Sequence, residues 1–102
     1  MAAPPRIVWS PAAVRQLEEA LAYLSEQSVL AATTLLEETL AAAGSLTSMA
    51  ERGREVPELR DGRTRELLVQ KYRLMYEVSA ETVELVGFVH GARDFHRWQR
   101  GD

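Results

Sequence analysis

The chain has 102 residues, of which 46% are hydrophobic, and it contains no cysteine. A chain of this size can bury one hydrophobic core, so we predict a single domain spanning residues 1–102. The lack of cysteine excludes disulfides and thiolate metal sites, and no segment approaches the about 20 apolar residues that cross a bilayer. Because the sequence shows no metal-ligand cluster, nucleotide-binding glycine loop or export signal, we expect no cofactor, no membrane contact and a cytoplasmic location.

The basic residues are concentrated in the second half of the chain. The formal net charge is −3, which argues against a protein that coats nucleic acid. Residues 1–51 hold two basic residues against six carboxylates, whereas residues 52–102 hold ten against nine. Eleven of the twelve basic residues are arginines, and a planar guanidinium suits bidentate contacts with phosphate or carboxylate. Contact residues are therefore expected in the second half.

The first half predicts a short strand followed by two helices. Residues 6–9 are β-prone, and Ser10-Pro11 combines an N-cap residue with proline at the first helical position. Apolar spacing of three and four residues then predicts an amphipathic helix from Pro11 to about Gln27. Ser28 can cap a second helix that ends at Gly44 or continues to Met49, and the short link predicts an antiparallel αα-hairpin. The residues predicted to be buried are Val14, Leu17, Leu21, Leu24, Val29, Ala32, Leu35, Leu36, Leu40 and Ala43.

After Gly53 the spacing of apolar residues becomes that of β-strands. Strands are predicted at 54–59, 64–70, 72–78 and 82–90, and Pro57 confines the first to an edge or an irregular strand. The predicted fold class is therefore α+β: an N-terminal strand, an antiparallel αα-hairpin, then a three- to four-stranded antiparallel sheet with the helices over one face. Residues 94–100 could form a short helical turn.

Alternation along the last two strands assigns side chains to two faces, if Val78 pairs with Val83. The residues predicted under the helices are Tyr72, Leu74, Tyr76, Val78, Val83, Leu85, Gly87 and Val89. The residues predicted on the opposite, exposed face are Arg73, Met75, Glu77, Glu84, Val86, Phe88 and His90, with Arg73 across from Phe88. Such an apolar patch is typical of an interaction surface, unless Phe95 and Trp98 of the tail fold back over it.

The register of strand 64–70 stays open at this point. The link at Gln70 fits a two-residue turn or a slightly longer one, and a shift of one residue exchanges the two faces of the strand. In one register Arg65 joins Arg73, and in the other Glu66 and Leu68 do.

Four segments of the second half, taken in order, resemble the RelE/ParE toxin superfamily. They are Val56-Pro57-Glu58-Leu59, Arg65-Glu66-Leu67-Leu68-Val69, Tyr72-Arg73-Leu74-Met75-Tyr76-Glu77-Val78 and His90-Gly91-Ala92-Arg93-Asp94. The segment Trp9-Ser10-Pro11-Ala12-Ala13 is similar to the opening of the same superfamily, so the resemblance covers nearly the whole chain. It implies the same α+β fold and a toxin of a type II toxin-antitoxin pair, neutralised within a hetero-oligomer by a cognate antitoxin. An edge strand or an exposed apolar sheet face would suit that partner.

The resemblance is closest to ParE-like members, which inhibit DNA gyrase by binding and without catalysis. RelE-like members instead cleave messenger RNA on the ribosome, and an inactive relative that only binds antitoxin is a third alternative. A nuclease would use Arg65, Arg73 and Arg93 on phosphate and His90 for proton transfer. Gln99 stands where those nucleases carry a C-terminal tyrosine, so we predict a gyrase-binding toxin rather than an enzyme.

The same resemblance supplies the candidate contact residues. Arg73 and Arg93 match two arginines of the family by position, and both are predicted to lie in front of the sheet. The residues predicted to contact the target are Arg73, Arg93, Phe88, Met75 and Trp98. We interpret His90 first as a structural residue, because it belongs to the His-Gly-x-Arg-Asp segment of ParE-like members. Arg93 could alternatively pair with Glu77 or Glu84 and fix the tail.

Overall fold

The structure is a computed structural model that describes residues 3–101, so Met1, Ala2 and Asp102 lie outside the described residues. Its elements are β1 (Arg6–Trp9), α1 (Pro11–Ser25), α2 (Val29–Ser45), β2 (Arg54–Glu55), β3 (Thr64–Val69), β4 (Tyr72–Val78), β5 (Thr82–Val89) and α3 (Gly91–Arg100). The strands form one five-stranded sheet in the order β1-β5-β4-β3-β2. Every neighbouring pair is antiparallel except β1 and β5, which run parallel.

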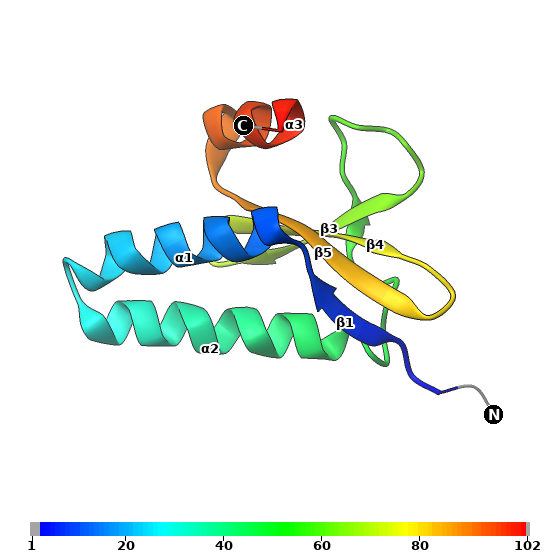
Figure 1. The fold of residues 1–102 in the computed structure, drawn as a ribbon, viewed down its shortest axis with the longest axis horizontal. Helices are drawn as coiled ribbons and strands as arrows, with labels where there is room; N and C mark the ends of the chain where they lie inside the picture. The colour runs from blue at the N-terminus through cyan, green and yellow to red at the C-terminus, as the bar shows by residue number, and fades with distance from the viewer. Residues whose placement is uncertain (1–2, 102) are drawn as a thin grey trace.

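The predicted α+β class is confirmed, and β1 joins the sheet as an additional edge strand. Figure 1 shows α1 and α2 side by side as a hairpin, with α3 set apart from them at the end of the chain. In the described part of the chain, no helix combines the length and the hydropathy needed to cross a membrane.

Both helices of the hairpin begin at the serines expected from the sequence. The Oγ of Ser10 accepts a hydrogen bond from the N–H of Ala13, and the Oγ of Ser28 accepts one from the N–H of Ala31, each at 3.1 Å. These side chains supply acceptors to backbone donors that have no partner within the first helical turn. Local capping therefore explains where α1 and α2 begin.

The main core lies between the αα-hairpin and one face of the sheet. Its buried members are Ala13, Leu17, Leu35, Ala43, Leu46, Val69, Tyr72, Leu74, Tyr76, Val83, Leu85 and Phe88. The predicted buried stripe is partly wrong, because Val14, Val29 and Leu40 are 40%, 71% and 51% exposed. Leu35 is buried as predicted, and Thr39, which was not predicted to be buried, lies with it in the centre of α2. The hydroxyl of Thr39 donates to the carbonyl of Leu35 at 2.7 Å, so its burial leaves no unsatisfied polar group.

A β-bulge interrupts the pairing of β4 with β5. Val78 pairs with Val83, as expected, but Met75 pairs with Gly87, so that Val86 is an additional residue in β5. A bulge places two residues of one strand opposite one residue of its partner and bends the strand. Beyond this point the alternation of faces is shifted by one residue.

The bulge reverses the predicted faces at the end of β5. Phe88 pairs with Leu74 and lies in the main core, where it is 2% exposed. Val89 takes the predicted place of Phe88 opposite Arg73. The prediction that Phe88 lies on the outer face is therefore wrong, and so is the prediction that Gly87 and Val89 lie under the hairpin.

The outer face of the sheet is covered by α3, which forms a second core. Its buried members are Val56, Met75, Val89 and Phe95, with Leu59, Val86 and Trp98 packed around them. Met75 has no exposed surface, so the prediction of an exposed apolar patch is wrong. The alternative, in which Phe95 and Trp98 fold back over this face, is confirmed. The tail forms a helix of 10 residues rather than a short turn.

The register of β3 places the carboxylate of Glu66 on the same face of the sheet as Arg73. Leu68 pairs with Arg73 and Glu66 pairs with Met75, whereas Arg65 pairs with Tyr76. Of the two registers left open by the sequence, the structure adopts the one with Glu66 and Leu68 beside Arg73. At the edge of the sheet, β2 is only two residues long and ends before Pro57, as the missing N–H of proline requires.

Candidate functional site

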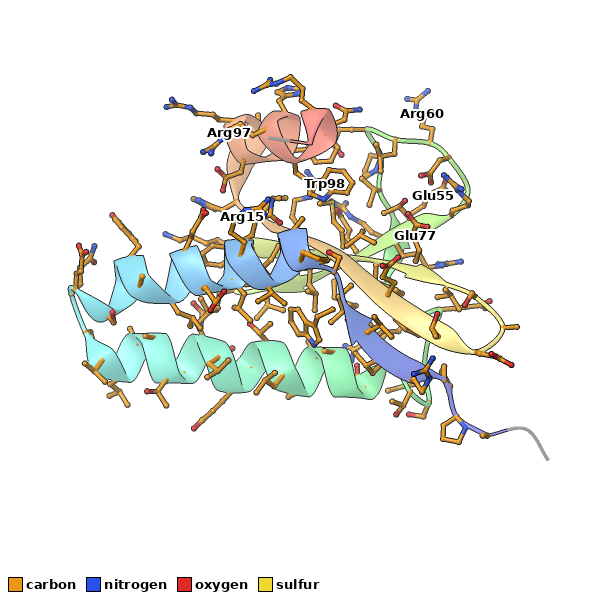
Figure 2. The ribbon with its side chains drawn as sticks, viewed as in Figure 1. Arg15, Glu55, Arg60, Glu77, Arg97 and Trp98 are labelled. Carbon is orange, nitrogen blue, oxygen red and sulfur yellow. The ribbon has the colours of Figure 1, made fainter. Side chains whose placement is uncertain are left out.

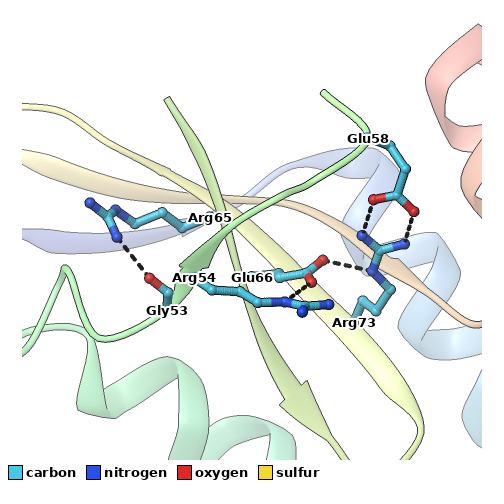
Figure 3. Close-up of polar contacts among 6 residues, drawn as sticks. All are labelled: Gly53, Arg54, Glu58, Arg65, Glu66 and Arg73. Carbon is cyan, nitrogen blue, oxygen red and sulfur yellow. Dashed lines mark hydrogen bonds and ion pairs between the residues drawn. The ribbon is translucent and has the colours of Figure 1, made fainter. Parts of the chain in front are cut away.

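The guanidinium group of Arg73 lies in a network of carboxylates on the outer face of the sheet (Figure 3). Its Nε donates a hydrogen bond to Oε1 of Glu66 at 2.6 Å. Its two terminal nitrogens donate to the two oxygens of Glu58 at 2.8 and 2.7 Å. The other oxygen of Glu66 accepts a hydrogen bond from Nε of Arg54 at 2.6 Å. Arg73 therefore uses all three of its nitrogens on two carboxylates.

Phe95 of α3 closes this network from above. The central carbon of the Arg73 guanidinium lies 5.0 Å from the centre of the Phe95 ring, which is the geometry of a cation–π contact. The side chain of Arg73 is 14% exposed and that of Glu66 is 0% exposed. A buried carboxylate is tolerated when it is paired and hydrogen-bonded. Arg73 thus joins β3, β4 and α3, and the prediction that its guanidinium is exposed in front of the sheet is wrong.

The pairing with Arg73 also favours the ionised form of Glu58. The hydrogen bonds from Arg73 hold the pKa of Glu58 below its usual value, against a smaller opposing effect of burial. The hydrogen bonds that Arg73 donates to Glu58 raise the pKa of Arg73 in turn, and the burial of Arg73 works against that rise. Arg73 stays protonated at every physiological pH and cannot serve as a general base.

Arg65 lies on the opposite face of the sheet and holds a loop. Its Nη1 donates to the carbonyl oxygen of Gly53 at 2.8 Å and, more weakly, to that of Glu51 at 3.4 Å. The N–H of Gly53 donates to the hydroxyl of Tyr76 at 2.9 Å. A Cβ at Gly53 would lie 2.5 Å from that hydroxyl, so the contact requires glycine. Arg65 is structural here and is not brought together with Arg73.

Arg93 is exposed on the side of α3 that faces away from the sheet. Side chains two residues apart in an α-helix point about 200° apart, so Arg93 lies opposite Phe95. Because Phe95 covers Arg73, the two arginines predicted to share one surface are on opposite sides of α3. Within residues 3–101, Arg93 forms no ion pair with Glu77 or Glu84.

Trp98 fixes α3 to the bulge in β5. Figure 2 shows Trp98 between α3 and the sheet. Its indole Nε1 donates to the carbonyl oxygen of Val86 at 2.7 Å, and its ring packs beside Phe95 with 5.6 Å between the ring centres. Trp98 is half-buried, so its first role is to position the helix that carries Arg93.

His90 lies beside a cleft that the sequence did not indicate. The cleft has a volume of about 410 Å³ and is enclosed by α1, the ends of β4 and β5, and α3. The ring of His90 lies 5.4 Å from that of Tyr72, which stacks on Phe88 at 4.8 Å. Neighbouring residues of a strand point to opposite faces, so Tyr72 and His90 are separated from Arg73 by the sheet. The arginines and the histidine of a nuclease are therefore not assembled at one point.

Comparison with known proteins gives a family and a fold. Residues 7–95 match the family model for the ParE toxin of type II toxin-antitoxin systems, parDE. Among solved structures, a chain of the chromosomal ParDE toxin-antitoxin system from P. aeruginosa is similar, with a TM-score of 0.72 and 14% sequence identity. The match covers 89% of this chain and 100% of that chain, and at this identity it shows the fold alone. No sequence among curated proteins matches the chain.

Proposed function

Because the chain belongs to the ParE toxin family of type II toxin-antitoxin systems, we propose that it arrests growth by binding DNA gyrase and that a cognate antitoxin neutralises it. Membership of the family confirms the resemblance found in the sequence. The target and the manner of neutralisation are proposals, and the contacts of the arginines support them.

The engagement of Arg73 is the observation that favours binding over catalysis. A ribonuclease centre brings cations and acid/base groups to a single phosphate. Here a phosphate could reach Arg73 only by displacing the bidentate carboxylate of Glu58 and the buried carboxylate of Glu66. Arg65 donates to backbone carbonyls on the other face. A toxin that acts by binding needs an exposed surface and no such centre.

The exposed side of α3 is the proposed contact with the target, and Arg93 lies on it. Phe95 and Trp98 hold this helix against the sheet, so the guanidinium of Arg93 is presented from a rigid element, which favours specific contact. Met75 and Phe88 are buried and therefore do not belong to the proposed contact surface. Trp98 contributes by positioning α3.

The free edge of β3 is the proposed contact with the antitoxin. β2 pairs only with Arg65 and Glu66, so in the described structure residues 67–69 have no strand on that side. Leu68 is 67% exposed at this edge. An extended segment of the antitoxin that pairs with the edge would satisfy the backbone groups of β3 and cover Leu68.

A supercoiling assay with purified DNA gyrase tests the proposed target. We expect the toxin to inhibit supercoiling or to accumulate cleaved DNA, and the product of the adjacent open reading frame to reverse that effect. No inhibition with toxin in large excess over gyrase would contradict the proposal. Codon-positioned cuts of messenger RNA in a translation reaction would instead indicate the ribonuclease, and normal growth after induction would indicate an inactive relative.

A further inference from the structure

Three cationic side chains from separate elements converge on the cleft of about 410 Å³. Arg15 comes from α1, Lys71 from the turn between β3 and β4, and Arg97 from α3. All three are exposed, and within the part of the chain that the structure describes none forms an ion pair. Figure 2 shows Arg15 on the side of α1 that faces α3, from which Arg97 projects. A group of positive charges around a cleft raises the local concentration of an anion.

The floor of this cleft is aromatic. The rings of Tyr72 and Phe88 stack with an interplanar angle of 7°, and the ring of His90 is tilted against Tyr72 at 49°. Tyr23 of α1 also lines the cleft and is 62% exposed. Aromatic side chains beside a cationic groove are the arrangement on which unpaired nucleobases stack. The volume lies within the range of about 300–1,000 Å³ that is common for small-molecule sites.

Two carboxylates in the same cleft distinguish between the possible anions. Glu19 and Asp94 line it together with the three cations. An acidic peptide would bring further carboxylates against them. A nucleotide carries phosphates that can pair with the cations. Its base also carries N–H groups that can donate hydrogen bonds to the carboxylates. The mixed lining therefore fits a nucleotide better than an acidic peptide.

We propose that this cleft binds a segment of single-stranded nucleic acid, with phosphates on Arg15, Lys71 and Arg97 and a base against the exposed ring of Tyr23. A duplex would not offer a free ring face, because its bases are stacked on one another. Arg97 lies one helical turn from Arg93 on α3, so this cleft adjoins the proposed gyrase contact but is built from different residues.

Fluorescence anisotropy with short labelled oligonucleotides tests the site. The probes are oligothymidine DNA, oligouridine RNA and a DNA duplex of equal length. We expect at least one single strand to bind more tightly than the duplex. The logarithm of its affinity should fall against the logarithm of salt concentration with a slope of about −2, since each of three phosphates contributes about −0.7. The preferred single strand identifies the natural class of ligand.

Matched variants separate the cleft from general charge effects. Arg15→Gln, Lys71→Gln and Arg97→Gln should each weaken binding several-fold and reduce the slope by about 0.7. Tyr23→Ala should weaken binding roughly tenfold and leave the slope unchanged. Arg6→Gln is the control, because the exposed Arg6 pairs with Thr82 at the far end of β5.

Several outcomes would overturn the proposal. They are no binding of either single strand at low salt, equal binding of the duplex, or an equal loss with Arg6→Gln. Displacement of the oligonucleotide by polyglutamate at lower concentration than by unlabelled oligonucleotide would assign the cleft to an acidic polypeptide. Circular dichroism melting curves verify that every variant is folded. The gyrase assay uses a different readout, so either proposal can fail while the other stands.

Discussion

The indole nitrogen of Trp98 donates a hydrogen bond of 2.7 Å to the carbonyl oxygen of Val86, which is the additional residue of the β5 bulge. A bulge takes its extra residue out of the regular ladder, and here α3 provides the partner. Phe95 of the same helix covers Arg73. The bulge, the C-terminal helix and the carboxylate network therefore form one structural unit on the outer face of the sheet.

Replacing Trp98 by phenylalanine tests the hydrogen bond that joins these elements. Trp98→Phe keeps an aromatic ring in the second core but removes the donor to Val86. We expect a loss of about 1–3 kcal/mol in the free energy of unfolding, because the carbonyl loses its partner where water is largely excluded. Urea unfolding measures the change. Gln99→Ala, at an exposed position of the same helix, is the control and should stay within about 0.5 kcal/mol. Equal stability of Trp98→Phe and the wild type would contradict the role of the bond.

Gly87 is predicted to be required for the docking of α3. A Cβ at this position would lie 2.6 Å from Cε of Met75 and 2.7 Å from Nε1 of Trp98. The methionine terminus can move, but the indole is held by Val86, so Gly87→Ala should displace it. We expect a loss of about 1–3 kcal/mol and a red shift of tryptophan emission. Gly44→Ala is the matched control, since nothing lies within 4 Å of its Cβ, and it should raise stability by up to about 1 kcal/mol. Equal effects of the two substitutions would show that packing at Gly87 is unimportant.

The sequence predicted the elements where local signals act. Ser10 and Ser28 determine the starts of both helices through hydrogen bonds three residues away, so a pattern in the chain is sufficient. The buried face of α2 is harder to predict because most of its positions are apolar or small. Several faces of the helix then fit the spacing of apolar residues equally well. The bulge had one signal, Gly87 inside a strand, which is typical of such an irregularity. Regular alternation without a bulge places Phe88 on the opposite side of the sheet from the one it occupies.

The candidate sites depend on contacts that a single sequence does not determine. Arg73 donates to Glu58 and Glu66, and the contact with Glu66 requires the register that the sequence left open. A different register would have placed Arg65 beside it. The cleft between α1 and α3 depends on where the C-terminal helix docks, and no local pattern encodes that position. The family, the fold and the outer face of Arg73 were therefore predictable, whereas the burial of Arg73 under Phe95 and the face of Arg65 were not.

Loss of Arg73 is predicted to destabilise the fold through Glu66. Arg73→Leu leaves the buried carboxylate with Arg54 alone, and we expect a loss of about 3 kcal/mol, since a buried charge loses its principal partner. The double variant Arg73→Leu with Glu66→Leu should recover part of that loss, because no charge then remains buried. Chemical denaturation of the two variants and the wild type measures both effects. A double variant that is less stable than Arg73→Leu would contradict the explanation.

Asp61 is predicted to make stability depend on acid pH. Its Oδ1 accepts hydrogen bonds from the N–H groups of Arg63 and Thr64, each at 2.9 Å, and its Oδ2 accepts one from the hydroxyl of Thr64 at 2.8 Å. These bonds lower the pKa of Asp61 from the ordinary 3.8 to about 2. The folded-state pKa is depressed, so the stabilising contribution is complete above about pH 5 and is lost as the pH falls toward 2. Asp61→Asn should therefore flatten the fall in melting temperature across this window. Glu18→Gln, at an exposed position of α1, is the control and should not change it.

Arg93 and Leu68 are predicted to separate toxicity from neutralisation. Arg93→Ala removes a guanidinium from the exposed side of α3, where no ion pair holds it among the described residues. Growth arrest should be lost while the melting temperature and co-purification with the antitoxin are unchanged, because β3 lies elsewhere. Leu68→Lys places a charge on the free edge of β3 and opposes strand addition, so it should weaken antitoxin binding and leave growth arrest intact. Arg6→Ala controls for the general loss of a surface charge.

The measurements are growth after induction, with and without the antitoxin, and the amount of antitoxin that co-purifies with each variant. If folded Arg93→Ala still arrests growth, the target contact lies on another surface than the exposed side of α3. If Leu68→Lys binds the antitoxin as tightly as the wild type, the antitoxin does not use the edge of β3. Loss of both properties in either variant would mean that one surface serves both partners, in which case antitoxin binding would neutralise the toxin by directly covering its target contact.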